Sequence, residues 1–152
     1  MACSRTSPTL ESEVEVDVLF NDSDPMGVTW HGNYFRYLES ARAALLGKIG
    51  YSYPEMVESG YLWPVVEAHI KYLKPTTFGQ RLAVRASLEE YESRLKIAYV
   101  IEERKSGERV TTASTTQVAV HKERGEMCFA SPQVLLDKVR ACLSAAKDSA
   151  EP

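Results

Sequence analysis

The chain is poor in the features on which several protein classes depend. Its three cysteines include no C-x-x-C pair, and their odd number suits a reducing compartment better than a disulfide framework. No apolar run approaches the ~18 residues of a membrane-spanning helix. Among eight glycines there is neither a Walker loop nor a G-x-G-x-x-G turn. A net charge of −3 without a basic stripe argues against nucleic acid as a partner.

The length and composition predict one ordinary globular domain. A chain of 152 residues, 44% hydrophobic, can bury a core of its own. The polar residues 1–12 contain no apolar segment of the kind that a signal peptide carries. We therefore expect a cytoplasmic protein with a flexible tail at 1–12, a single domain at 13–147 and a short tail at 148–152.

Hydrophobic periodicity predicts the order of the secondary-structure elements. Residues 13–20 alternate between apolar and mostly acidic side chains, as a half-buried strand does. Residues 33–47 follow helical spacing, and Phe35 widens an apolar face broad enough for a helix wrapped by a sheet. The elements expected after this helix are a short helix at 54–58, strands at about 62–73, 82–89, 95–101 and 110–121, and a helix at 133–147 that Ser131 caps. This order predicts an α+β fold with an antiparallel sheet, in which the last four strands form a meander.

The side chains that look reactive gather on the loop between the first strand and the long helix. Asp24 precedes Pro25, which biases it away from the α region, and Gly27 permits a left-handed turn. His31 and Asn33 lie where the helix begins, so backbone N–H groups without helical partners are available there to an oxygen ligand. A carboxylate, an imidazole and a helix N-terminus are the components of an acyl-transfer site.

This loop resembles the active-site loop of a known enzyme family. Residues 22–34 read Asp-Ser-Asp-Pro-Met-Gly-Val-Thr-Trp-His-Gly-Asn-Tyr. The hotdog-fold acyl-CoA thioesterases of the 4-hydroxybenzoyl-CoA thioesterase and Tol–Pal-cluster type read roughly D-x-D-x-x-G-x-x-[YW]-[HFP]-x-x-Y, followed by an aromatic helix with Glu and Arg. The resemblance covers about residues 13–137. Phe20 stands where some members carry a Tyr, so no role for that hydroxyl is carried over.

The resemblance implies a hotdog fold, in which a curled sheet surrounds a central helix. It also implies hydrolysis of an acyl or aryl thioester of coenzyme A or of acyl carrier protein. Asp24 is then the nucleophile or general base, and the backbone amide of His31 holds the oxyanion. No cofactor is expected beyond the coenzyme A or phosphopantetheine that the substrate carries. The expected substrate-binding residues are Gly27, Trp30, Asn33 and Tyr34.

Other interpretations of these residues remain open. Asp22 fits a loop-organising hydrogen-bond acceptor better than a catalytic group. A metal site at Asp22, Asp24 and His31 lacks a further obvious ligand, and the EF-hand pattern fails at its fifth and twelfth positions, so we expect no metal. Glu39 lies between two arginines, where an ion pair is expected. A hotdog dehydratase that uses a helix carboxylate, or a non-hydrolytic acyl-thioester binding module, is the alternative function.

Two further features bear on catalysis and assembly. The segment 50–54 lacks the last glycine of a G-x-S-x-G motif, and Cys128 has no positioned histidine, so neither supports a catalytic triad. The strand at 65–72 is apolar enough to invite pairing if it lies at a sheet edge. Since two subunits usually pair in the resembled fold, we expect a homodimer or homotetramer with the active site at the subunit interface.

Overall fold

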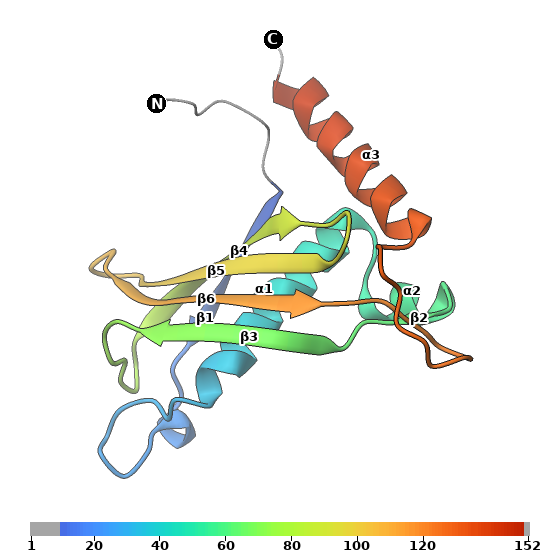
Figure 1. Ribbon diagram of the computed structural model, residues 1–152. Helices are drawn as coiled ribbons and strands as arrows, with labels where there is room; N and C mark the ends of the chain where they lie inside the picture. The colour runs from blue at the N-terminus through green and yellow to red at the C-terminus, as the bar shows by residue number, and fades with distance from the viewer. Residues whose placement is uncertain (1–9, 151–152) are drawn as a thin grey trace.

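A computed structural model describes residues 10–150, in which a curved five-stranded sheet packs on a long helix and two short strands form a second sheet (Figure 1). The strands are β1 (Glu11–Asp17), β2 (Tyr61–Leu62), β3 (Val65–Tyr72), β4 (Arg81–Glu90), β5 (Leu95–Glu103), β6 (Arg109–Gln117) and β7 (Val120–His121). The helices are α1 (Asn33–Ile49), α2 (Tyr53–Glu58) and α3 (Gln133–Ala150). None of the helices described within this range is long and apolar enough to cross a membrane.

The main sheet has five antiparallel strands in the order β1-β4-β5-β6-β3. The predicted α+β class with an antiparallel sheet is confirmed. The predicted meander of four strands is wrong for β3, which pairs with β6 at the far edge instead of with β4. Alternation along a strand reports which face is buried, but it does not report which strand is the neighbour.

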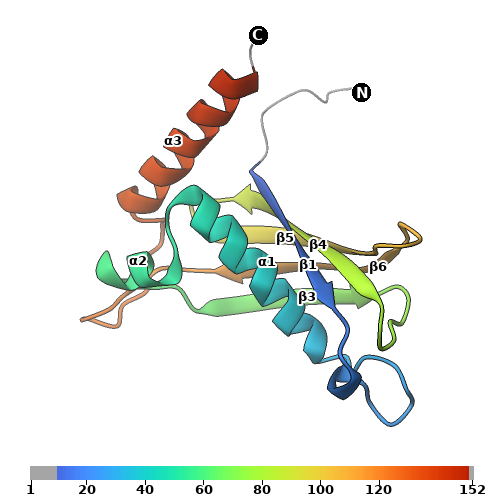
Figure 2. The same ribbon diagram turned by 180° about the vertical axis from the view of Figure 1, so that it is seen from behind.

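Helix α1 lies across one face of the sheet and contacts β1 and β4 (Figure 2). Its buried residues are Tyr34, Tyr37, Leu38, Ala41, Leu45, Leu46 and Ile49. They pack with inward-facing side chains of the central strands, including Leu82, Val84, Ile97 and Ile101, into one core cluster. The prediction that Phe35 widens this face is wrong, since its side chain is 42% exposed. Phe35 therefore lies outside the apolar face that α1 buries.

The chain leaves the first strand earlier than its alternation predicts. β1 ends at Asp17, and residues Phe20–Asp22 form a short 3-10 helix in which Phe20 is 76% exposed. The Asp22 carboxylate accepts a hydrogen bond from the Leu19 N–H at 2.9 Å. This local bond favours a turn over continued strand pairing.

Two predicted strands are divided, and one predicted cap is not formed. The strand expected at about 62–73 breaks at Pro64, which lies between β2 and β3 and has no N–H for a ladder. The strand expected at 110–121 divides into β6 and β7. Ser131 does not cap α3: its hydroxyl is buried without a hydrogen-bond partner among the described residues, and the helix begins at Gln133. The short helix predicted at 54–58 is confirmed as α2.

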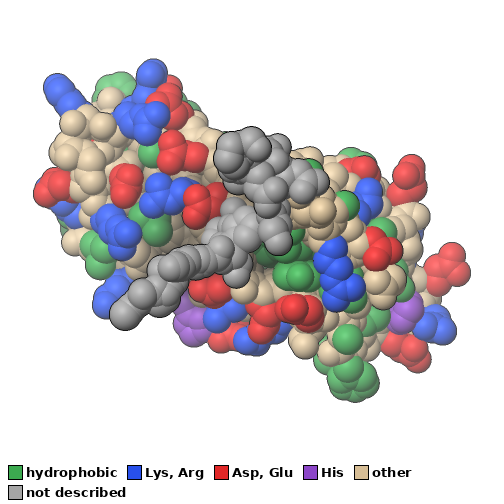
Figure 3. All heavy atoms as spheres, turned by 90° about the horizontal axis from the view of Figure 1, so that it is seen from above, with side chains coloured by type: hydrophobic (Ala, Val, Ile, Leu, Met, Phe, Trp, Pro, Cys, Tyr) green, Lys and Arg blue, Asp and Glu red, His purple; other side chains and the backbone are tan. Residues whose placement is uncertain are grey.

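The surface carries charges of both signs without separating them. On the outer face of β1, β4 and the turn after β5, Arg81 pairs with Asp17 at 2.9 Å and Arg104 pairs with Glu15 at 2.8 Å. Figure 3 shows acidic and basic side chains interspersed on the face that it draws. Exposed pairs of this kind stabilise a fold by only ~0–1 kcal/mol each.

Candidate functional site

Asp24 lies in a tight turn between the 3-10 helix and α1. Its Oδ1 accepts the Met26 N–H at 2.9 Å, its own N–H donates to the Val28 carbonyl at 2.8 Å, and its carbonyl accepts the Gly27 N–H at 2.9 Å. Gly27 has φ +86°, a conformation that side chains rarely adopt. The turn therefore fixes one carboxylate oxygen of Asp24, while Oδ2 accepts no hydrogen bond from any described residue.

Asp22 joins this turn to α1. Its side chain is 4% exposed, accepts the Tyr37 hydroxyl at 2.8 Å through Oδ2 and pairs with Arg36 through Oδ1. Its carbonyl accepts the Trp30 N–H at 2.9 Å and the Asn33 side-chain amide at 2.8 Å. Burial, followed by the hydrogen bond to Asp22, raises the pKa of the Tyr37 hydroxyl, which therefore stays a donor. These hydrogen bonds hold the loop to α1, as expected for Asp22 as the residue that organises the loop.

His31 stands immediately before the start of α1. Gly32 is the N-cap, and the first helical residue is Asn33. The His31 N–H has no hydrogen-bond partner among residues 10–150, whereas its carbonyl accepts the Tyr72 hydroxyl at 2.8 Å. The Trp30 ring lies over Gly32, where an added Cβ would come within 2.3 Å of the ring. Because Gly32 has no side chain, the Trp30 ring can pack against the N-terminus of α1.

A cluster of buried hydroxyl groups connects the first turn of α1 to the neighbouring loops. The Tyr34 hydroxyl lies 2.9 Å from Thr76 Oγ1, which in turn lies 2.6 Å from Thr29 Oγ1. The Tyr34 ring meets the Tyr72 ring edge-on, with centroids 5.1 Å apart. These contacts fix the loop, α1 and the end of β3 relative to one another.

These elements enclose a cavity of about 260 Å³. It is lined by Asp24, Met26, Val28, Thr29, His31, Tyr34, Tyr72, Leu73, Lys74 and Pro75. Three of the six residues expected from the sequence, Asp24, His31 and Tyr34, therefore meet in one cavity. Gly27, Trp30 and Asn33 do not line it: Gly27 shapes the turn, Trp30 covers Gly32, and the Asn33 amide is bonded to Asp22.

Sequence reasoning missed the residues that the end of β3 contributes. Tyr72 and Lys74 were visible only as members of a strand and of a connection, distant in sequence from Asp24. The Tyr72 hydroxyl nevertheless bonds to the backbone of His31, and the Lys74 ammonium pairs with Glu108. The sequence showed that this strand has an apolar face, but it did not indicate that the end of the strand lies against the Asp24 loop.

The alternative chemistries find less support in the geometry. Glu39 pairs with Arg42, as expected, whereas Arg36 pairs with Asp22 instead. Glu39 does not line the cavity of Asp24 and His31. Across the described part of the chain, no three His, Cys, Asp or Glu side chains are grouped so that they could hold a metal ion.

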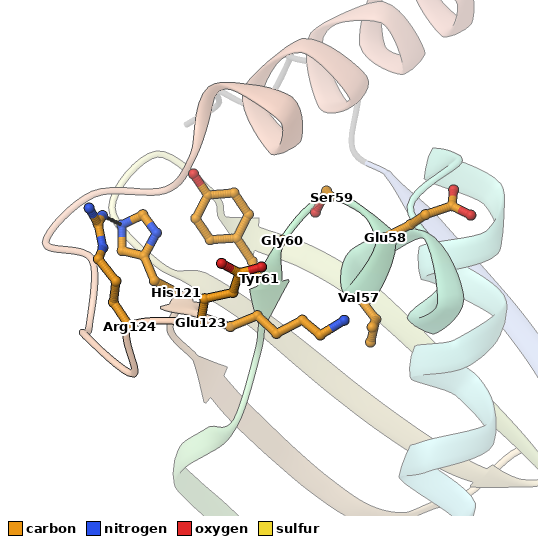
Figure 4. A pocket seen from close by; sticks show the side chains of 9 residues that line it. Val57, Glu58, Ser59, Gly60, Tyr61, His121, Glu123 and Arg124 are labelled. Atoms are coloured by element: carbon orange, nitrogen blue, oxygen red, sulfur yellow. Dashed lines mark hydrogen bonds between the residues drawn. The ribbon is translucent and has the colours of Figure 1, made fainter.

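A larger cavity, of about 460 Å³, lies between the end of α2 and the turn after β7 (Figure 4). In Figure 4 the Tyr61 ring, His121 and Arg124 border it on one side, and Val57 and Glu58 border it on the other. Arg124 lies 2.9 Å from the His121 ring nitrogen. Each of these side chains is at least partly open to solvent, and they include no polar group with the burial of Asp22. The cavity beside Asp24 is therefore the better candidate for chemistry.

Comparison with known proteins identifies relatives of the whole chain. The family described as the thioesterase-like superfamily matches residues 18–139. A Bacillus subtilis (strain 168) protein named as a candidate acyl-CoA thioesterase, YneP, is 31% identical over 112 residues, covering 74% of this chain and 81% of that one. The 1,4-dihydroxy-2-naphthoyl-CoA hydrolase of Thermosynechococcus vestitus is 29% identical over 123 residues, covering 78% and 84%.

A solved structure supports the same assignment. The DHNA-CoA thioesterase of Staphylococcus aureus superposes with a TM-score of 0.78 at 26% identity, covering 93% of this chain and 96% of that one. The hotdog fold expected from the loop is thereby confirmed. With its sheet, its central helix and its Asp24 loop, this chain belongs to the hotdog thioesterase-like superfamily.

Proposed function

We propose that this protein hydrolyses acyl or aryl thioesters of coenzyme A in the cavity beside Asp24. The observation that carries the proposal is the pairing of a carboxylate that has one unengaged oxygen with a free backbone N–H at His31, both in the lining of one cavity. The related proteins named for acyl-CoA or dihydroxynaphthoyl-CoA hydrolysis support the substrate class. The odd cysteine count supports a cytoplasmic location.

The reaction assigns each group a separate role. Asp24 attacks the thioester carbonyl, or it takes a proton from the water that attacks. The His31 N–H donates to the oxygen on which negative charge develops, and the positive end of α1 favours that charge. The C–S bond then breaks and releases the thiol of coenzyme A, and water supplies the oxygen of the free acid. The proposed reaction requires no cofactor beyond the coenzyme A of the substrate.

A panel of thioesters tests the activity directly. Purified protein should release free thiol from at least one acyl-CoA or aryl-CoA substrate, measured with a thiol-reactive dye. The second arm of the panel presents the same acyl groups on acyl carrier protein, because the family resemblance implies either coenzyme A or acyl carrier protein as the carrier. Absence of thiol release from the whole panel would contradict the proposed function.

The exposed edge of β3 supports a homodimer as the active form. Among the described strands β3 pairs with β6 alone, and its residues except Ile70 are exposed, including Val66 at 57%. Directly opposite residues of an antiparallel pair share a face. The two-fold axis, which runs between the two strands, must therefore lie midway between one residue and the same residue of the second copy. Centring the axis on His69 places Glu67 opposite Lys71 of a second copy, which is a favourable pair of charges.

This register also completes the site. It places Tyr72, which lines the Asp24 cavity, beside the start of β3 of the second copy, where a bulge lies between Val65 and Glu67. The other subunit then lies beside each cavity, as expected for an active site at a subunit interface. A dimer of dimers would repeat the same arrangement.

Light scattering should therefore give a dimer, or a dimer of dimers, at micromolar concentration. In the dimer each Glu67 faces Lys71 of the other copy. Glu67→Lys therefore creates two pairs of like charges and should raise the dimer dissociation constant. The exchange variant Glu67→Lys/Lys71→Glu restores opposite charges and should restore the dimer. A wild-type monomer at micromolar concentration would contradict the assembly, and equal weakening by both variants would contradict the register.

A further inference from the structure

A third cavity, of about 370 Å³, lies where α1, α2 and the start of β3 meet. Its lining consists of Glu39, Arg42, Tyr53, Met56, Val57, Tyr61, Leu62, Trp63, Val65 and Gln117. Apolar and aromatic side chains make most of this wall, and two of them, Met56 and Trp63, are buried in the core. A mostly apolar cavity with a few convergent polar groups is the usual form of a site for a small organic group.

The charged side chains of this cavity neutralise one another. The Arg42 side chain is 11% exposed and pairs with Glu39. The Tyr53 hydroxyl accepts a hydrogen bond from Arg42 Nε at 3.1 Å and donates one to Glu39 at 2.8 Å. Since the guanidinium already has a carboxylate partner, the cavity is not built to select an anion.

Gln117 is the polar residue that remains incompletely bonded. It is 3% exposed, and its Nε2 donates to the Trp63 carbonyl at 2.7 Å, which fixes the amide orientation. Its Oε1 is buried and has no hydrogen-bond partner among the described residues. Buried side-chain acceptors are nearly always paired, and Gln117 differs from the other such residues, Thr111 and Ser131, in belonging to the lining of this cavity.

We propose that this cavity receives the acyl part of the thioester and that Gln117 Oε1 accepts a hydrogen bond from a hydroxyl group on it. The inference rests on the proposed thioesterase function. The β3 pairing described above places the cavity, which includes Trp63 and Val65, beside Tyr72 of the second copy. Each site is therefore composite, with Asp24 from one subunit and the hydroxyl-binding cavity from the other. The aromatic side chains of Tyr53, Tyr61 and Trp63 suit a flat hydroxyaryl group.

Substrate pairs that differ by one hydroxyl group test the role of Gln117. Wild-type protein should hydrolyse at least one hydroxybenzoyl-CoA isomer with a higher kcat/KM than benzoyl-CoA. Gln117→Met removes the acceptor at similar volume and should lower kcat/KM for that isomer roughly 5- to 10-fold, with little change for benzoyl-CoA. Thr111→Val, which removes another buried unpaired oxygen from the same strand but outside the cavity, should leave the preference unchanged.

The outcomes separate this inference from the proposed function. Thiol release without any preference for the hydroxylated substrates would overturn the inference and leave the thioesterase proposal intact. So would equal losses for both substrates in a folded Gln117→Met variant, with folding checked by circular dichroism. If the Gln117→Met variant does not fold, the preference of the wild-type protein for a hydroxybenzoyl-CoA isomer over benzoyl-CoA still tests the inference.

Mixed dimers test whether the site is composite. Val57→Trp fills the cavity from an exposed position on α2, and Asp24→Asn disables the catalytic loop. After the two inactive variants are unfolded and refolded together, half of the dimers carry both changes. In a composite site, one of the two sites in each such dimer is intact, so about one quarter of wild-type activity should return. Activity no higher than that of the separate variants would overturn the composite site.

Discussion

Asp24→Asn is expected to lower kcat roughly 10²- to 10⁴-fold, the range for loss of a general base. The side-chain oxygen of asparagine can still accept the Met26 N–H, so the turn persists, but the charge that attacks or takes the proton is lost. Asp24 is half-buried in a surface loop, so little stability should be lost with it. Steady-state thiol release from the preferred substrate measures the effect.

The matched control is Asp137→Asn, which removes an exposed carboxylate from α3, a helix that lies far from the loop before α1 (Figure 1). It should leave kcat unchanged. Circular dichroism and light scattering should show that both variants keep the fold and the assembly of the wild type. An Asp24→Asn protein with near wild-type turnover would remove Asp24 from the mechanism.

The second large effect separates the backbone of His31 from its side chain. His31→Pro deletes the N–H and should raise the barrier by roughly 2.7–4 kcal/mol, the cost of losing one oxyanion donor. The change should be tolerated structurally because this N–H is unpaired among the described residues and Pro is accepted near the start of a helix. His31→Ala keeps the N–H, so it should cost much less than either His31→Pro or Asp24→Ala.

The measurement is kcat for the three variants with one substrate, with circular dichroism as the check on folding. In both His31 variants the carbonyl that accepts the Tyr72 hydroxyl remains, so this contact between the loop and β3 should survive. An alanine variant as inactive as Asp24→Ala would assign catalysis to the imidazole itself and would exclude the backbone role proposed for position 31.

Local features of the chain could be predicted from its sequence because they depend on neighbouring residues. The turn at Gly27 and the start of α1 follow from backbone preferences, and the family motif marked Asp24 and His31 as candidates. The position of β3 beside β6 could not be predicted, since strand neighbours depend on contacts distant in sequence. For the same reason Tyr72 was missed at the site and Gln117 was not considered. Both lie on strands whose alternation reports only burial.

The anchoring of the loop through Asp22 determines which loop positions tolerate substitution. The bonds that hold the loop to α1 involve backbone groups and the Asp22 carboxylate, whereas the tip of the loop carries Met26 with 81% of its surface exposed. Met26 borders the cavity, and its side chain is not part of that anchoring. Substitutions at position 26 can therefore change the shape of the cavity mouth while Asp24 stays in place. The loop thus separates a position whose side chain can be exchanged without moving Asp24 from a framework in which exchange would move it.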